Sequence, residues 1–252
     1  TAQQHPVRQD IVDAVRAHPV SWEPIDARSN PLALLSASEA IGLSGYHVEE
    51  ALAEEAERRK KRENTPRETL PGLGGNGFPR EFDARVEFPH CKHKIRNQFK
   101  CGSCWAFSTA ETWEDNACIL GLNGVDNETV FSTEDLLACA TFGSGKCGGG
   151  RINYAFDYVT SDGLVDEKCF PYTSQNGTVS SCPAEVGPDQ RVCPNKGISW
   201  NATKCAGQPN DLFTKDLMKG GIMQLGAVAT GYTVYEDFYN YKSGIYRHVT
   251  GE

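Results

Sequence analysis

The stretch Gln98-Phe99-Lys100-Cys101-Gly102-Ser103-Cys104-Trp105-Ala106-Phe107 decides the fold, because it joins a thiol to the start of a long apolar helix. Across residues 105–122 the apolar side chains recur at the spacing of one helical face, at Phe107, Ala110, Trp113, Ala117 and Leu120. Cys104 is therefore predicted in the first turn of a buried helix. There the unpaired N–H groups and the helix dipole favour the thiolate and lower the pKa of the thiol.

Three neighbours of Cys104 suit a nucleophilic site. Gly102 permits a close approach of another backbone segment, and Ser103 can cap the first N–H groups of the helix. Gln98 offers a side-chain amide donor where the oxyanion of an attacked carbonyl would form. We therefore predict covalent catalysis, with Cys104 as the nucleophile and Gln98 as an oxyanion donor.

Cys101 and Cys104 also form a Cys-x-x-Cys pair, which in other proteins serves redox exchange or zinc binding. A redox pair should follow a strand within a βαβ unit, and zinc needs a second closely spaced pair of ligands. Cys139 and Cys147 are too far apart in the sequence to supply that pair. We expect no metal and no cofactor.

The sequence resembles the papain family of cysteine proteases over residues 78–252. Cys101-Gly102-Ser103-Cys104-Trp105 is a local signature of papain and the cathepsins. Residues 147–150, Cys-Gly-Gly-Gly, are similar to the family's substrate-binding turn, and residues 78–85 resemble the start of a mature enzyme. Residues 241–252 are most similar to the cathepsin B branch.

This resemblance implies an α+β, two-lobed fold with a helical lobe, a β lobe and a cleft between them. It implies that Cys104 attacks the peptide carbonyl, that Gln98 binds the oxyanion and that Gly149 and Gly150 bind the substrate backbone. Trp105 would pack beside the thiol.

The resemblance also implies two disulfides, Cys101 with Cys147 and Cys91 with Cys118. The other five cysteines would then form two bridges and leave one over, in a pairing that spacing does not decide: Cys139, Cys169, Cys182, Cys193 and Cys205.

Composition limits the classes of partner. The chain has 252 residues, of which 39% are hydrophobic and 23% charged, enough to bury a core and to hold more than one domain. A net charge of -8 argues against nucleic-acid binding, which requires a basic surface. No apolar run reaches the length of a membrane span, and the first residues do not resemble a signal peptide. We expect peptide or protein substrates, and neither nucleic acid nor membrane.

The cysteines and the glycosylation motifs indicate the secretory pathway. Ten cysteines occur together with three Asn-x-Thr acceptor motifs, which begin at Asn127, Asn176 and Asn201. We expect a lysosomal, vacuolar or secreted protein whose leader has been removed.

Residues 1–77 are predicted to be a propeptide that inhibits its own chain; the alternative is a small helical appendage with only a packing role. Residues 9–17 have an apolar stripe that ends at His18-Pro19, and residues 46–63 form a charged helix. The Pro/Gly linker at 64–77 is expected to be cleavable and to run through the cleft past Cys104.

Residues 78–205 are predicted to form the helical nucleophile lobe with a disulfide-rich loop. Ser132 should cap a second helix, and residues 153–160 a third. Residues 148–150 are either a simple turn or an exposed backbone edge that binds an extended substrate, and we favour the edge. Residues 206–252 are expected to open an incomplete β lobe, with strands at 227–234 and 244–249 and a short helical turn at Asp237 and Phe238.

A thiol protease needs an imidazole base and a group that orients it. Spacing alone nominates His248, yet only four residues follow it, and Arg247 would oppose its positive charge. We expect the base in a separate C-terminal fragment that completes the β lobe. No histidine lies between His93 and His248, so we expect an endopeptidase without the paired histidines of an occluding loop. The alternatives are a pseudoprotease and a disulfide-stapled peptide-binding module.

Overall fold

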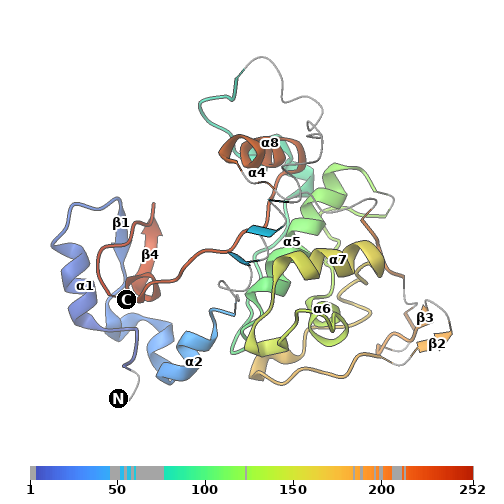
Figure 1. Ribbon diagram of the computed structural model, residues 1–252, viewed down its shortest axis with the longest axis horizontal. Coiled ribbons are helices and arrows are strands. Elements are labelled where there is room, and N and C mark those ends of the chain that lie inside the picture. The colour runs from blue at the N-terminus through green and yellow to red at the C-terminus, as the bar shows by residue number, and fades with distance from the viewer. Residues whose placement is uncertain are drawn as a thin grey trace.

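A computed structural model describes residues 4–45, 77–122, 124–183, 185–187, 190–195, 197–198, 201–205, 212 and 214–251, with the helical positions 52, 53, 56, 57 and 60. The predicted helix over 46–63 and the linker after it fall almost wholly outside these residues. Figure 1 shows two groups of elements: the N-terminal α1 and β1 with the C-terminal β4 at one end, and α5, α6 and α7 at the other.

The larger group is built on α5 (Cys104–Ile119), which packs against α6 (Thr133–Cys139) and α7 (Ile152–Ser161). α5 is buried on most of its circumference: its polar residues Thr109, Thr112 and Glu114 are buried along with its apolar ones. Ser132 caps α6, accepting the N–H of Asp135 at 3.0 Å. The three predicted helices are therefore confirmed, with α7 one residue longer at each end.

The N-terminal segment contains short elements around one predicted helix. α1 (Gln9–Arg16) buries Ile11, Val12 and Val15, as its apolar stripe predicts. After it come β1 (Trp22–Pro24), the 3₁₀ turns η1 (Ala27–Ser29) and η2 (Pro31–Leu34), and α2 (Ala37–Gly42). α2 begins with a capping box in which Ser36 and Glu39 satisfy each other's backbone N–H groups.

The two ends of the sequence meet in a small antiparallel sheet. β1 pairs with β4 (Tyr241–Gly244), with Trp22 opposite Gly244. The indole of Trp22 is 5% exposed and forms a second hydrophobic cluster with residues of α1. Tyr241, Tyr246 and Val249 pack against this cluster. The Nε1–H of Trp22 donates to the carbonyl of Arg247 at 2.9 Å.

The remaining elements are short, apart from one helix that the sequence analysis did not predict. They are α4 (Ala84–Glu87), η3 (Pro89–Cys91), η4 (Lys146–Gly148), η5 (Ser174–Asn176), β2 (Glu185–Gly187), β3 (Gln190–Arg191), α8 (Lys215–Leu225) and η6 (Glu236–Asn240). The helical turn expected at Asp237 and Phe238 is η6. Among the described residues, no helix combines the length with the apolar composition that a membrane span requires.

The strand predictions for residues 225–252 are mostly wrong. Residues 227–235 form no strand, and β4 ends at Gly244, where the predicted strand at 244–249 was to begin. The first element of this region is α8, which Thr214 caps through the N–H of Leu217. A strand needs a partner for its backbone groups, and β1 pairs with only three residues of this region: Tyr241, Ser243 and Gly244.

Four disulfides stabilise the larger group. The two expected from the resemblance are present, Cys91–Cys118 and Cys101–Cys147. The open pairing is resolved as Cys139–Cys182 and Cys169–Cys193. Cys104 and Cys205 take no part in a disulfide, so the cysteine left over is Cys205.

Candidate active site

The thiol of Cys104 lies at the first residue of α5, as predicted, and is partly buried. Burial raises the pKa of the Cys104 thiol, although hydrogen bonds with backbone N–H groups, including that of Gly45, act in the opposite direction. The prediction of a lowered pKa is therefore wrong for this conformation. The reason is that loss of solvation outweighs the helix N-terminus.

Ser103 does not cap the helix as predicted. It is the N-cap residue, but its side chain makes no capping bond. Its hydroxyl instead lies 3.2 Å from the hydroxyl of Tyr172 and 3.4 Å from the carbonyl oxygen of Cys101. Ser103 therefore positions the loop before the thiol, and the first N–H groups of α5 remain available to the sulfur.

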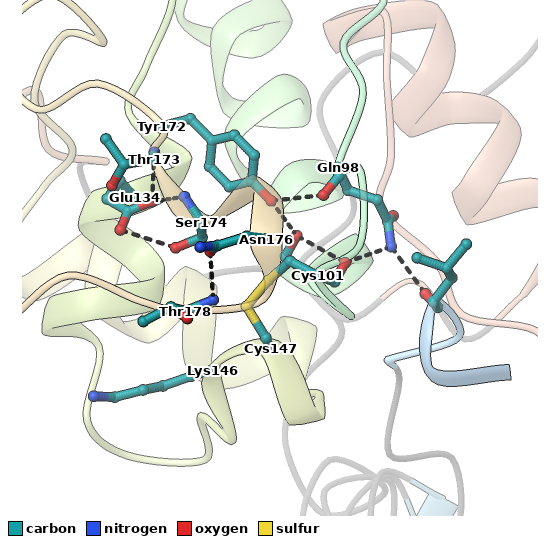
Figure 2. Close-up of a disulfide and its surroundings, with 12 residues drawn as sticks. Gln98, Cys101, Glu134, Lys146, Cys147, Tyr172, Thr173, Ser174, Asn176 and Thr178 are labelled. Carbon is teal, nitrogen blue, oxygen red and sulfur yellow. Dashed lines mark hydrogen bonds between the residues drawn. A yellow bond between two sulfur atoms is a disulfide. The ribbon is translucent and has the colours of Figure 1, made fainter. Parts of the chain in front are cut away.

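Gln98 is held by two hydrogen bonds from its side-chain amide and a third to its backbone carbonyl. Its Nε2–H groups donate to the carbonyls of Leu43, at 2.9 Å, and Cys101, at 2.8 Å. Figure 2 shows the hydroxyl of Tyr172 reaching the backbone carbonyl of Gln98, at 2.8 Å. The ring of Tyr172 packs edge-on against Phe107 of α5, with centroids 5.0 Å apart. Sequence reasoning missed Tyr172, because no local pattern connects it to Gln98.

The backbone around Gly102 is crowded, which explains the glycine. Its N–H donates to the carbonyl of Cys147 at 3.0 Å. A Cβ on Gly102 would lie 2.4 Å from the carbonyl oxygen of Gly42 and 2.5 Å from that of Cys147. The close approach predicted for Gly102 is therefore present on two sides.

The glycines of the predicted substrate edge lie beside Trp105. The Gly150 N–H donates to the carbonyl of Gly45 at 2.8 Å, which is the kind of bond expected for an extended peptide. A Cβ on Gly150 would lie 2.5 Å from the indole of Trp105, which is 2% exposed. Gly149 turns the chain with φ 114°, and its carbonyl accepts from the N–H of Gly145.

Residues 42–45 contact the thiol, the amide of Gln98 and the Gly150 edge. The linker at 64–77, which was predicted to fill the cleft, lies almost entirely outside the described residues. Just before residues 42–45, Glu39 of α2 pairs with Lys100 at 2.9 Å. Hydrogen bonds from Ser36 and Lys100 lower the pKa of Glu39 to about 2.

The histidines with described ring contacts face other groups. His248 lies 3.2 Å from the buried carboxylate of Asp237 and stacks on Tyr235 with centroids 3.8 Å apart. His93 bonds to Asp115 at 2.8 Å. His5 and His18 bond to backbone carbonyls within the N-terminal segment. His248 therefore has a structural place in the cluster around β4.

Tyr232 is a further residue near the thiol that sequence reasoning missed. It is 56% exposed. Burial of its hydroxyl, followed by the charge of Cys104, raises the pKa of Tyr232. Its side chain therefore lies within electrostatic reach of the sulfur. Within the described part of the chain, no group of His, Cys, Asp and Glu side chains could hold a metal ion.

Comparison with known proteins identifies the family. The model of the papain family cysteine proteases matches residues 78–252, which include Gln98, Cys104 and the Gly150 edge. The chain belongs to the papain family of cysteine proteases. The papain-like fold, expected from the resemblance, is thereby confirmed.

Curated relatives are cathepsin B-like. Cathepsin B-like cysteine proteinase 4 of Caenorhabditis elegans is 36% identical over 199 residues, covering 69% of this chain and 58% of the relative. Cathepsin B of Dictyostelium discoideum is 34% identical over 196 residues, covering 71% and 58%. The chain therefore spans less than two thirds of the length of these papain-family relatives.

Among solved structures, procathepsin B S9 from Trypanosoma congolense has a similar fold. The TM-score is 0.77 at 24% sequence identity, and the match covers 98% of this chain and 80% of the other. The match therefore includes the N-terminal segment as well as the papain-family domain.

Proposed function

We propose that this chain is the zymogen form of a cathepsin B-like cysteine endopeptidase. The observation that carries the proposal is the backbone of residues 42–45. The carbonyl of Leu43 accepts from the amide of Gln98. The N–H of Gly45 bonds to the Cys104 thiol, and the carbonyl of Gly45 accepts from the N–H of Gly150. A substrate peptide would need these same three contacts.

The proposed mechanism begins when residues 42–45 leave the cleft. The Cys104 thiolate then attacks the peptide carbonyl, and the oxyanion accepts from Gln98 Nε2 and from the Cys104 N–H. Gly149 and Gly150 hold the substrate backbone, and water hydrolyses the acyl-enzyme. We place the imidazole that moves the proton outside residues 1–252, in a C-terminal portion that completes the β lobe.

Residues 1–77 act as the inhibitory propeptide in this proposal, residues 78–205 form the nucleophile lobe, and residues 206–252 begin the β lobe. Two contacts outside the cleft support the inhibitory role. β1 pairs with β4, and Glu39 of the propeptide pairs with Lys100 next to the thiol loop. These two contacts hold the chain that leads to residues 42–45.

We place the protein in the secretory pathway, in an acidic compartment such as a lysosome or vacuole, or outside the cell. Four disulfides require an oxidising route. The acceptor residues Asn127, Asn176 and Asn201 are all exposed. These residues are the proposed glycosylation sites.

Replacement of Cys104 by alanine tests the function, in the full-length protein that includes the proposed C-terminal portion. After release of the propeptide, the wild type should cleave a fluorogenic peptide, and Cys104→Ala should bind the same peptide without turnover. Cys205→Ala is the matched control and should retain turnover. If the wild type also binds peptide without cleaving it, the protein is a pseudoprotease or peptide-binding module and the proposal is wrong.

A further inference from the structure

The loop formed by residues 172–178 connects the thiol region to one of the three glycosylation motifs. The hydroxyl of Tyr172 supports Gln98, and four residues later Asn176 begins the motif Asn-Gly-Thr. Figure 2 places Gln98, Tyr172 and Asn176 in one neighbourhood, around the disulfide Cys101–Cys147. The motif therefore lies beside the proposed catalytic site.

The loop contacts Lys100 directly. The carbonyl of Gln175 accepts the N–H of Lys100 at 3.1 Å. A Cβ on Gly177 would lie 3.7 Å from the carbonyl oxygen of Lys100. Because Lys100 is two residues from Gln98 and pairs with Glu39, the loop lies beside the part of the thiol region that α2 contacts.

A buried carboxylate fixes the base of this loop. Glu134 is 0% exposed and accepts the N–H groups of Thr173, Ser174 and Ser180, at 3.1, 3.2 and 3.0 Å, and the hydroxyl of Ser174 at 2.9 Å. Ser174 is itself buried, and Figure 2 shows these bonds from Thr173 and Ser174 to Glu134. A group attached to Asn176 is therefore held beside Lys100 and the thiol region.

The side chain of Asn176 is presented as an acceptor. It is exposed, and its Oδ1 accepts the N–H of Thr178 at 3.0 Å in a local turn that the unfolded chain can also form. Nδ2 of Asn176 has no hydrogen-bond partner within the described part of the chain. Gly177 follows with φ 89°, so the backbone turns sharply after the acceptor.

We propose that Asn176 carries an N-linked glycan that borders the Gln98 end of the cleft and restricts folded protein substrates more than short peptides. The donor is a lipid-linked pyrophosphoryl oligosaccharide. Nδ2 forms a bond to its anomeric carbon, the bond from that carbon to the pyrophosphate oxygen breaks, and the proton of Nδ2 leaves with the pyrophosphate. A glycan is bulky and hydrated, so it hinders a large substrate whose surface reaches Lys100. The effect on substrates rests on the proposed protease function; the modification does not.

The first experiment measures occupancy. The full-length protein is secreted from a eukaryotic host, and glycopeptides are mapped by mass spectrometry before and after enzymatic deglycosylation. Wild type and Thr178→Ser should carry the glycan at Asn176, and Asn176→Gln and Thr178→Ala should lose it. An unmodified Asn176 in the wild type would overturn the proposal.

The second experiment measures the consequence. For the activated enzyme, kcat/KM is compared for a folded protein substrate and a short fluorogenic peptide. Asn176→Gln and Thr178→Ala should raise the ratio of protein to peptide cleavage several-fold, with the peptide value unchanged. Asn127→Gln, which removes a motif elsewhere, should leave the ratio unchanged. An unchanged ratio in Asn176→Gln would contradict the restricting role.

A readout without turnover separates this inference from the proposed function. The alkylation rate of Cys104 is measured with a small reagent and with a polymer-linked reagent after removal of the propeptide. Loss of the Asn176 glycan should accelerate only the polymer-linked reagent. If this holds and no peptide is cleaved, the protease function fails and the glycan's position stands. If peptides are cleaved but neither alkylation rate depends on the glycan, the protease function stands and the proposed position of the glycan is wrong.

Discussion

Gly45 is the glycine of residues 42–45 that is packed most tightly against the loop before Cys104. A Cβ at this position would lie 1.9 Å from the carbonyl oxygen of Gly102, and that backbone is fixed by its bond to Cys147. At Gly42, three residues earlier, a Cβ would meet nothing within 4 Å. The two glycines therefore form a matched pair in which only one is required by close contact.

We expect Gly45→Ala to weaken autoinhibition. Overpacking of this kind costs roughly 1–3 kcal/mol, which corresponds to about a fivefold to hundredfold rise in the basal activity of the full-length zymogen. Gly42→Ala should leave the basal activity unchanged. Basal hydrolysis of a peptide at neutral pH is the measurement, and equal activities in the two variants would show that the segment is not held by this contact.

Gln98 should act on the chemical step more than on substrate binding. Removal of one oxyanion donor lowers kcat by about 10²–10³, so Gln98→Ala should lose activity in this range with a small change in KM. Tyr172→Phe keeps the amide but removes the hydroxyl that supports the Gln98 carbonyl, and should show a smaller loss in kcat. Steady-state kinetics of the activated enzyme distinguishes them. A loss confined to KM would contradict the oxyanion role.

At the scale of elements, the N-terminal segment is held by the pairing of β1 with β4 and by the indole of Trp22. This side chain is 5% exposed and bonds to Arg247 as well as packing on Tyr241 and Tyr246. The pairing joins residues more than 200 positions apart. The N-terminal segment and the segment around β4 therefore stabilise each other.

We expect Trp22→Ala to release this contact. Truncation of a buried tryptophan costs about 3–5 kcal/mol, which should raise amide hydrogen exchange in β1 and β4 and leave α5 protected. Trp22→Phe, which retains a ring but loses the bond to Arg247, should have a smaller effect. Exchange followed by mass spectrometry checks both. Unchanged protection of β4 in Trp22→Ala would mean that this sheet is stable without the indole.

The ion pair between Glu39 and Lys100 should make the attachment of α2 depend on pH in the acid range. The pKa of Glu39 is lowered to about 2, so its stabilising contribution is present above the ordinary value of 4.5 and is lost as the pH falls from 4.5 towards about 2. The contribution of an exposed pair is small, so acid should loosen α2 without unfolding the protein. In Glu39→Gln, zymogen activation should lose part of its dependence on pH in this range. An activation profile identical to that of the wild type would exclude a role for this pair.

At the scale of the molecule, the helical lobe should be more stable in acid than at neutral pH. Burial outweighs the attraction of Arg96 and raises the pKa of Glu114 to about 7, and burial raises that of Asp135 to about 6. A carboxyl whose pKa is raised in the folded state favours folding most below its ordinary value. That advantage is lost as the pH rises towards the folded pKa.

Thermal unfolding should therefore shift downwards between about pH 4.5 and about pH 7. Glu114→Gln retains the hydrogen-bonding shape but cannot ionise, so its midpoint should vary less over this range. The activated enzyme is the sample, so that release of the N-terminal segment does not contribute to the transition. A wild-type midpoint that rises over the same range would show that Glu114 is ionised by Arg96 throughout.

The parts of the fold that were predictable are those governed by local sequence. The stripe of α1, the cap of α6 and the start of α5 at Cys104 depend on residues within a few positions of each other. The strand predicted at 227–234 failed, because a strand needs a partner that local propensity does not supply.

The candidate site was only partly predictable for the same reason. Its motif identified Cys104, Gln98 and Gly150. The contacts from Tyr172, Leu43 and Gly45 cross long separations in sequence, so they follow from tertiary packing and not from the motif. The raised pKa of the thiol is likewise a property of the covered site.

The most direct test of the account is the reactivity of Cys104 before and after the propeptide leaves. The full-length protein is treated with a small peptide-like electrophile, and modified cysteines are located by mass spectrometry. We predict slow labelling in the zymogen, fast labelling of Cys104 after activation, and fast labelling in the Gly45→Ala zymogen. Equal and slow labelling of Cys104 in all three would contradict the claim that residues 42–45 cover an otherwise competent nucleophile.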